Sequence, residues 1–240
     1  MLLDATESQL VLVDYQERLM PAIFEGQAAL ANAIRLAQIA RLVDVPVWGT
    51  EQNPTRLGGN DAQLRALCQR TLSKMHFSAA ADGLGAWLRP PAKPQGGNAR
   101  SLPKHLQKAR EQEQQAIERP SIVIAGCEAH VCLLQTALGL RRAGKPLWVA
   151  ASACGSRVPA DHALAMQRLR DAGATIVASE MVVFEWLHDC RHPRFREVLA
   201  CVKARPLPAA APALADRAPD RQPSASARPT MSPSARGPAP

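Results

Sequence analysis

The sequence predicts an α/β fold, in which a mostly parallel six-stranded sheet carries helices on both of its faces. Short β-branched or aliphatic runs alternate with longer segments of helical periodicity, which is typical of parallel strands joined by crossover helices. The 240 residues are 47% hydrophobic, so the chain can bury one large core. We therefore expect a doubly wound, three-layer α/β/α domain.

Six short runs, separated by helical patterns and turn residues, are predicted as the strands of this sheet. They are residues 9–14, 45–49, 70–74, 121–125, 146–150 and 174–177. Between the first two runs, residues 27–43 form a predicted helix whose polar side chains recur at every third position, so only a narrow stripe meets water. Its broad apolar surface suits packing on the sheet and on a second subunit.

The composition of the chain changes at two places. From Pro206 onward the sequence is rich in Pro, Ala, Ser and Arg and has no periodicity, which predicts a disordered tail over residues 206–240. A Pro- and Gly-rich stretch followed by a polar run predicts a surface insertion over about residues 84–120. Residues 1–205 are therefore expected to form one domain that contains this insertion.

The charge and the cysteine content bear on the partners and the location of the chain. The formal net charge of +8 is spread as isolated arginines and only 4% of residues are aromatic, so no nucleic acid is expected as a partner. No stretch is apolar for long enough to span a bilayer, and the start lacks a signal peptide pattern, so we expect a cytoplasmic protein. Six cysteines are too sparse for a disulfide scaffold and are expected to be thiols.

Three residues with ionisable side chains that could take part in catalysis fall at the carboxyl ends of the predicted strands. Ligands bind at this edge in open α/β sheets. Asp14 closes the first strand, Lys74 closes the third, and Cys132 opens the helix after the fourth. A helix N-terminus and a neighbouring ammonium lower the pKa of a thiol, so we expect Cys132 to have an increased thiolate fraction. Asp14 could then accept the thiol proton during attack on a substrate.

Each of these residues also has a simpler explanation. An Asp at a strand end is commonly a turn residue, a Lys after a strand is commonly solvated, and a Cys in a helix is commonly part of the core. Their joint placement at one edge of the sheet favours a catalytic site. A zinc site formed by Cys127, Glu128, His130 and Cys132 lacks a recognised ligand spacing, so neither a metal nor another cofactor is expected.

Several motifs together resemble the isochorismatase-like superfamily of cysteine hydrolases, over about residues 10–203. The matching motifs are "LVLVDYQERLMPAI", "VWGTEQNPTRLG", "KMHFSA", "AGCEAHVCLLQTAL", "ACGSR" and "GATIVASEMVVFEWL". Within the superfamily they look most similar to the isochorismatase domain-containing proteins. The connection between "HFSA" and the fourth strand is longer than is usual in the family, and "TEQNP" stands where nicotinamidases carry a metal-binding Asp-x-His motif.

The resemblance implies a strand order of 3-2-1-4-5-6, with the Asp14 and Cys132 strands side by side. It also implies a catalytic triad of Asp14, Lys74 and Cys132. In the family a cis peptide bond precedes the nucleophile, which corresponds here to the bond between Cys127 and Glu128, and the amides of Glu128 and Cys132 would form the oxyanion hole. On this basis Cys132 attacks the substrate and Cys127 shapes the turn.

The expected function is that of a cysteine-dependent hydrolase, which cleaves a small amide-like or isochorismate-like substrate through a thioester. The alternative is a catalytically weak member of the same fold that acts as an oligomeric scaffold or binding protein. The apolar first helix and the resemblance both favour a homo-oligomer. Residues that follow the strands at the same edge are expected to line the substrate pocket, namely Gln16, Glu51, Gln52, Asn53 and Phe77.

Overall fold

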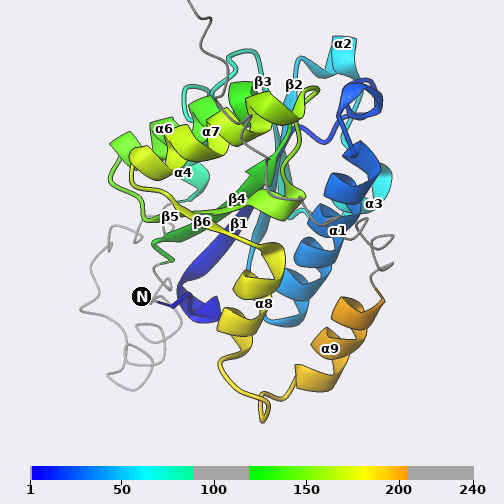
Figure 1. Cartoon of the computed structure of the whole chain (residues 1–240), viewed down its shortest axis with the longest axis vertical. Helices are drawn as coiled ribbons and strands as arrows, with labels where there is room; N and C mark the ends of the chain where they lie inside the picture. The colour runs from blue at the N-terminus through cyan, green and yellow to red at the C-terminus, as the bar shows by residue number, and fades with distance from the viewer. Residues whose placement is uncertain (1, 89–118, 205–240) are drawn as a thin grey trace, which may run out of the picture. The chain divides into compact units, whose positions relative to one another are not determined.

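The computed structural model describes residues 2–88 and 119–204. Six parallel strands form one sheet in the order β3-β2-β1-β4-β5-β6, which confirms the predicted fold class and strand order (Figure 1). The strands are β1 (Ser8–Val13), β2 (Val47–Gln52), β3 (Arg70–Lys74), β4 (Ser121–Gly126), β5 (Leu147–Ala150) and β6 (Thr175–Val177). The predicted tail over residues 206–240 and most of the predicted insertion lie outside the described residues.

Helices cover both faces of the sheet. Figure 1 shows α1, α8 and α9 on one side of the strands and α6 and α7 on the other, as expected for a doubly wound fold. The α-helices are α1 (Gly26–Leu42), α2 (Pro54–Leu57), α3 (Ala62–Leu67), α4 (Leu84–Trp87), α6 (Leu134–Arg142), α7 (Pro159–Asp171), α8 (Ser179–Leu187) and α9 (Phe195–Lys203). Short helical turns are η1 (Ala5–Glu7), η2 (Met20–Ala22), η4 (Ala129–Leu133) and η5 (Ala151–Ala153).

Helix α1 corresponds to the helix predicted over residues 27–43. Its small apolar side chains are buried, and it packs not only on β1 and β2 but also on α3, α8 and α9. Helices of the same chain therefore cover the broad apolar surface of α1. This surface is not evidence for a second subunit, contrary to the expectation from its sequence.

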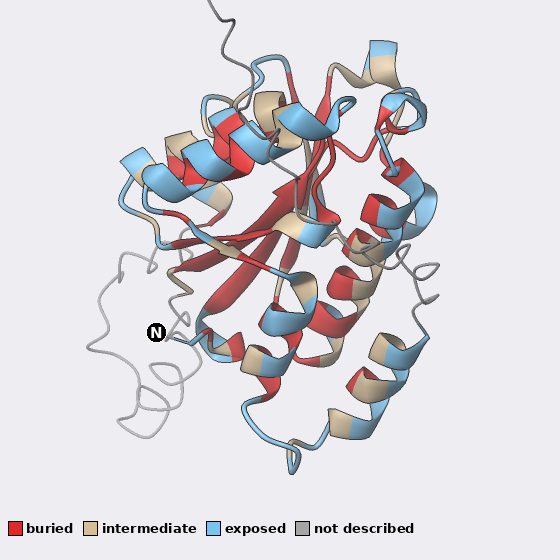
Figure 2. Cartoon of the chain, viewed as in Figure 1, coloured by how far each residue is buried: buried red, intermediate tan, exposed pale blue. Residues whose placement is uncertain are grey.

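The two central strands, β1 and β4, are buried along their entire length, and Figure 2 shows them as a red band through the sheet. They lie in register, with Val13 opposite Gly126, so both strands end at the same level. A Cβ atom on Gly126 would lie 2.4 Å from the carbonyl oxygen of Val13, which explains the need for glycine at this point. The close approach brings Asp14 and the turn after β4 side by side.

Strand β2 begins and ends later than predicted. A strand is predicted over residues 45–49, whereas β2 extends to Gln52, with Thr50 paired to Val13 and Gln52 paired to Lys74. The last three residues are polar, so hydrophobicity alone did not identify them as a strand. The consequence is that Thr50 and Gln52 project from a rigid strand beside the predicted site.

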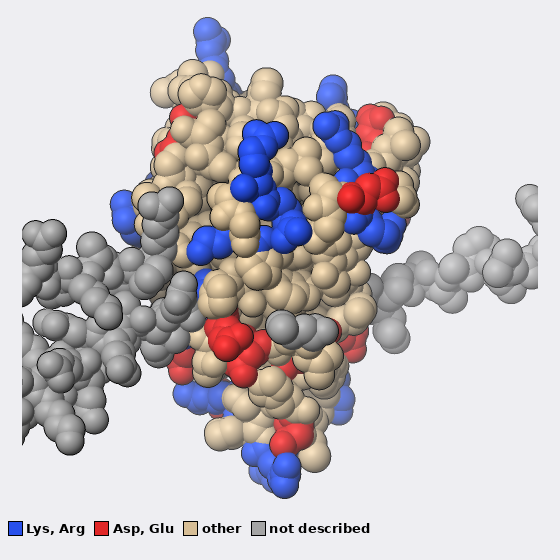
Figure 3. Space-filling model, turned by 90° about the vertical axis from the view of Figure 1, so that its left-hand side faces the viewer, with Lys and Arg blue, Asp and Glu red and all other residues tan. Residues whose placement is uncertain are grey.

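The surface carries both signs of charge. Figure 3 shows one face of the chain, with Lys and Arg side chains gathered on its upper half and Asp and Glu side chains both beside and below them. No helix in the described part of the chain is long and apolar enough to cross a membrane.

Candidate active site

A buried ion pair lies at the centre of the sheet edge predicted to hold the site. The Nζ atom of Lys74 lies 2.8 Å from Oδ2 of Asp14, and both side chains are fully buried. Asp14 follows β1 with a left-handed backbone (φ 56°), and its N–H donates to the carbonyl oxygen of Thr50. The hydroxyl of Thr50 donates to the other carboxylate oxygen, Oδ1, at 2.7 Å. The carboxylate is therefore held at a fixed place by two strands.

The ammonium group of Lys74 is enclosed by oxygen atoms. Besides Asp14, it contacts Oε1 of Gln52 at 2.7 Å and the carbonyl oxygens of Phe77 and His76 at 3.1 and 3.4 Å. Burial of a cation is costly unless hydrogen-bond and charge partners offset the loss of water, and these four oxygen atoms provide such partners. Lys74 is thus a positioned charge rather than the solvated side chain that the simpler explanation would require.

Cys132 lies in η4, a single turn of π-helix that precedes α6. Cys132 is predicted at the start of the helix after the fourth strand, whereas the α-helix itself begins at Leu134. The peptide bond between Cys127 and Glu128 is cis, as expected from the resemblance. Cys127 is fully buried and its N–H donates to Val13, so this cysteine anchors the turn to β1.

The expectation that Cys132 has a lowered pKa is wrong. Cys132 is only 6% exposed. Its burial, together with the negative charge of Asp14, raises the pKa of the thiol to about 12. Lys74 acts in the opposite direction and lowers this pKa, but by less. The sequence could not show this outcome, because the helix position is visible in it whereas the depth of burial is not. The resting side chain is therefore a thiol that interacts with both a carboxylate and an ammonium.

The carbonyl oxygen and the carboxylate of Glu128 both accept hydrogen bonds. The carbonyl oxygen accepts from the N–H groups of Val131 and Leu133 at 3.1 and 3.2 Å. The carboxylate accepts from Nε of Arg157 at 2.7 Å and from the Arg157 N–H at 3.3 Å. Among the described residues, the N–H of Glu128 has no hydrogen-bond partner.

Two residues beside the site, Thr50 and Arg157, were not predicted. Thr50 was missed because the predicted strand ended at Gly49, one residue before it. Arg157 ends the motif "ACGSR" and Glu128 lies in "AGCEAHVCLLQTAL", but the two residues are 29 positions apart and the motifs do not show that they pair.

The structure gives the five predicted pocket residues different positions. Gln52 accepts a hydrogen bond from the ammonium group of Lys74 through its side chain. Phe77 accepts one from the same group through its backbone carbonyl oxygen, and Phe77 itself is 53% exposed. Gln16 is fully buried and bonds to the backbone of Gln52 and of a nearby loop. Glu51 accepts from the Asn60 N–H, and Asn53 accepts from the Thr55 hydroxyl. Gln16, Glu51 and Asn53 thus support loops, and their contact with a substrate stays a prediction.

Within residues 2–88 and 119–204, no three His, Cys, Asp or Glu side chains gather in a way that could hold a metal ion.

The sequence of the chain matches a known protein family. Residues 8–181 match the model of the isochorismatase domain. The chain belongs to this family. Isochorismatase domain-containing protein 2A from Mus musculus is 34% identical over 201 residues, which cover 84% of this chain and 84% of that protein. Membership of the family supports hydrolase activity in general.

Solved structures show the same fold at lower sequence identity. MAR1 ribonuclease from Caenorhabditis elegans has a TM-score of 0.67 and 24% identity, and the match covers 85% of this chain and 93% of that chain. The YcaC gene product from Escherichia coli, described as an octameric hydrolase of unknown specificity, has a TM-score of 0.63 and 20% identity. That match covers 85% of this chain and 97% of the YcaC chain. These likenesses concern the fold alone.

Proposed function

We propose that this member of the isochorismatase family is a cysteine-dependent hydrolase, in which Cys132 attacks a small amide-like or isochorismate-like substrate. The observation that carries the proposal is the buried pair of Asp14 and Lys74, with which the Cys132 thiol interacts. A buried ion pair is rarely favourable for stability alone, so its position beside a thiol calls for a functional reason.

For an amide, the proposed reaction begins with a protonated thiol. As Sγ of Cys132 forms a bond to the carbonyl carbon, Asp14 accepts the thiol proton, and Lys74 stabilises the negative charge on sulfur. Asp14 then gives this proton to the leaving nitrogen, and the C–N bond breaks to form a thioester. Water attacks the thioester, its proton passes through Asp14 to the departing sulfur, and the acid is released.

The turn that follows β4 supplies the proposed oxyanion hole. The carbonyl oxygen of the substrate becomes negatively charged during attack, and a pair of N–H groups directed at it would stabilise this charge. We assign this role to the N–H groups of Glu128 and Cys132. The lack of a partner for the Glu128 N–H among the described residues supports the assignment, because this donor is free to bind a substrate.

Exposed apolar side chains surround the same edge of the sheet. Phe24, Met75, Phe77 and Val158 are 54%, 68%, 53% and 49% exposed. We propose that the protein is a homo-oligomer and that these side chains take part in its interface. The description of the structurally similar YcaC as an octamer supports this proposal.

One observation favours the second candidate function, a catalytically weak scaffold or binding protein. The raised pKa of Cys132 keeps the free thiol protonated, which slows any attack that is not coupled to proton transfer. A substrate panel distinguishes the two candidates. We expect the purified chain to hydrolyse at least one member of a panel of small amides, ureides and vinyl ethers, and Cys132→Ala to lose that activity. Equal turnover by the wild type and Cys132→Ala would contradict the hydrolase proposal.

A further inference from the structure

The loop that follows β3 closes around the ammonium group of Lys74. The carbonyl oxygens of Phe77 and His76 accept from Nζ of Lys74 at 3.1 and 3.4 Å. A third carbonyl oxygen of the loop, that of Met75, accepts from Nε2 of Gln52 at 2.8 Å, and Oε1 of the same amide accepts from Lys74 at 2.7 Å. The backbone of this loop therefore supplies two oxygen partners of the ammonium group and orients another.

One side chain, that of Asp82, closes this loop. Its Oδ2 atom accepts from the backbone N–H groups of Met75 and His76 at 2.9 and 3.0 Å. Its Oδ1 atom lies 2.7 Å from Nδ1 of His76. The carboxylate is thus tied to the two residues that directly follow Lys74, and both of these residues carry a carbonyl group that holds the surroundings of the ammonium group in place.

The other side of the loop is fixed to α6. The Ala79 N–H donates to the hydroxyl of Thr136, a fully buried residue of α6, at 3.0 Å. A Cβ atom on Gly139 of α6 would lie 2.8 Å from Cβ of Ala80, so the loop and the helix are in close contact. The N–H of Asp82 donates to the carbonyl oxygen of Ala79 at 3.2 Å. Asp82 therefore connects the start of the loop to the segment that is anchored on α6.

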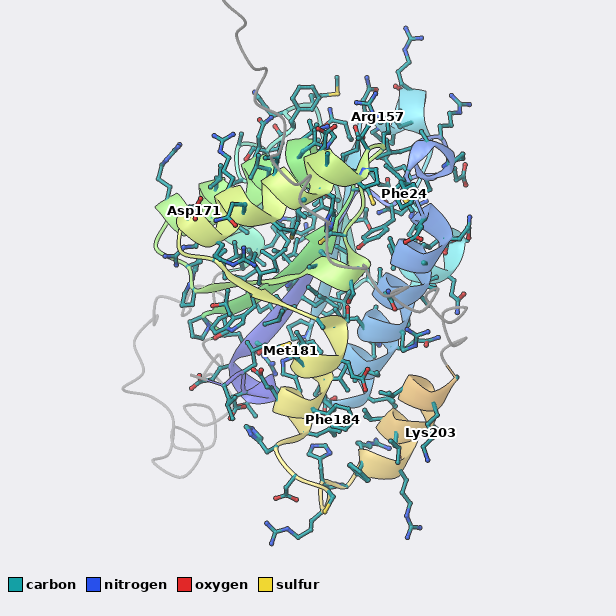
Figure 4. All side chains as sticks on the ribbon, in the orientation of Figure 1. Phe24, Arg157, Asp171, Met181, Phe184 and Lys203 are labelled. Atoms are coloured by element: carbon teal, nitrogen blue, oxygen red, sulfur yellow. The ribbon has the colours of Figure 1, made fainter. Side chains whose placement is uncertain are left out.

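We propose that Asp82 is a positioning residue, which holds the loop carbonyl groups against the Lys74 ammonium group and so maintains the charge that stabilises the Cys132 thiolate. This inference rests on the proposed function of Cys132. The contacts of Asp82 described above are with its own loop, so its role is to act through Lys74. The loop begins at the upper end of the molecule, where Figure 4 labels Phe24, one of the exposed side chains at the same edge of the sheet.

The charge of Asp82 and its hydrogen bonds should have opposite effects on Cys132. Hydrogen bonds from His76, through its ring and its backbone N–H, lower the pKa of Asp82, so the carboxylate is negative at neutral pH. A nearby negative charge raises the pKa of a thiol, whereas the ammonium group of Lys74 lowers that of Cys132. Removal of the Asp82 side chain should therefore accelerate alkylation of Cys132 if only its charge matters, and should slow alkylation if it positions Lys74.

The rate at which iodoacetamide alkylates Cys132, followed by peptide mass spectrometry at a fixed pH below the pKa of the thiol, tests this inference. We expect Asp82→Ala to slow alkylation about threefold, because the ammonium group is less well placed. Asp82→Asn keeps an oxygen acceptor for the two backbone N–H groups and should react nearly as fast as the wild type.

Asp61→Ala is a matched control. The Asp61 carboxylate accepts from the backbone N–H groups of Gln63 and Leu64 at 3.0 and 3.1 Å, at the start of α3. This substitution also removes a carboxylate and two backbone contacts, but it leaves the loop after β3 intact. The rate at Cys132 should therefore be unchanged in Asp61→Ala.

A double variant shows whether Asp82 acts through Lys74. Lys74→Met alone should slow alkylation about tenfold, because the charge is lost. In the Lys74→Met background, Asp82→Ala should cause no further slowing, since no ammonium group is left to be positioned. If Asp82 only supported the local structure, it would slow alkylation by the same factor in both backgrounds, and this result would overturn the inference.

The outcomes separate this inference from the proposed function. An unchanged or faster rate in Asp82→Ala would overturn positioning, and so would equal slowing in Asp82→Asn or in Asp61→Ala. The buried thiol of Cys154 should stay unmodified in each variant, which verifies folding. If Lys74→Met itself left the rate unchanged, the role of Lys74 in the proposed function would fail.

Discussion

Two regions of the chain contain ion pairs of the same length but in opposite surroundings. At the carboxyl ends of β1 and β3, Asp14 and Lys74 lie 2.8 Å apart with both side chains fully buried. In the loop between α8 and α9, Asp189 and Arg191 also lie 2.8 Å apart, with side chains that are 47% and 87% exposed. Figure 1 shows this loop at the lower end of the molecule, away from the ends of β2 and β3.

Each region also contains a cysteine. Cys132 is buried and interacts with both members of its ion pair, whereas Cys190 is exposed and directly follows Asp189. A pair in water is screened and its members move independently, so it has little influence on a neighbouring thiol. Burial, rather than the kinds of residue or their separation, is what couples the three groups of the proposed site.

The largest difference between the regions should appear in turnover. Cys132→Ala removes the proposed nucleophile and should lower kcat with any substrate of the chain by on the order of 10³-fold or more. Cys190→Ser and Cys127→Ser should leave measurable activity, because neither thiol attacks the substrate. Steady-state kinetics of the three variants checks this, and an equal loss in Cys132→Ala and Cys127→Ser would show that the roles are wrongly assigned.

The free energy of unfolding should also fall more when the buried ion pair is broken than when the exposed one is. Asp14→Asn leaves the buried ammonium of Lys74 without its charged partner, and should lower the free energy of unfolding by about 3 to 5 kcal/mol. Asp189→Asn breaks a pair of the same length in the exposed loop and should leave the urea midpoint unchanged. Urea unfolding of both variants measures the contrast. Similar midpoints for the two variants would mean that burial does not set the strength of the first pair.

A smaller effect tests how closely the site depends on backbone packing. Gly126→Ala places a Cβ atom 2.4 Å from the carbonyl oxygen of Val13, so β1 and the catalytic turn must separate, at a cost of about 1 to 3 kcal/mol. Gly85 has open space around its Cα, so Gly85→Ala is a matched control that should not destabilise the chain. Thermal unfolding of the two variants decides the point, and equal melting temperatures would argue against the close approach.

The sequence predicted the fold well because the signals for it are local. Strand β3 has the predicted bounds, and the motifs around Asp14, Lys74 and Cys132 carried the family resemblance and hence the strand order. The polar end of β2 was missed, because a strand at a functional edge need not be apolar. The predicted pKa of Cys132 was wrong, because the depth of burial depends on every element packed around it.

The pairing of Arg157 with Glu128 shows a different limit of sequence reasoning. Glu128 precedes Arg157 by 29 positions, and only the pairing of the two loops in space brings them together. The covered surface of α1 is a further case, since the helices α8 and α9 that cover it are distant in the sequence. The contact of Asp14 with Lys74 is also distant in the sequence, but it could be predicted because both residues end strands at the same edge of the sheet. The pairing of Arg157 with Glu128 joins two loops, and the strand order does not indicate it.

The central claim is that Cys132, Asp14 and Lys74 form one electrostatic unit, and the alkylation rate of Cys132 at a fixed pH near 8 tests it most directly. Only the thiolate reacts, so below the pKa of the thiol a change in that pKa appears as a change in rate. Lys74→Met removes the charge that lowers this pKa and should slow alkylation about tenfold. Asp14→Asn removes a charge that raises it and should accelerate alkylation, even though turnover is lost.

The α8–α9 loop provides the reference within the same samples. Peptide mass spectrometry after treatment with iodoacetamide reports Cys132 and Cys190 together, and we expect the rate at Cys190 to be the same in the wild type and both variants. The buried thiol of Cys154 should stay unmodified throughout, which verifies that each variant is folded. If the three groups form one electrostatic unit, the two variants should change the rate at Cys132 in opposite directions while the rate at Cys190 stays constant. Rates at Cys132 that stay unchanged in both variants, or that change in the same direction, would contradict it.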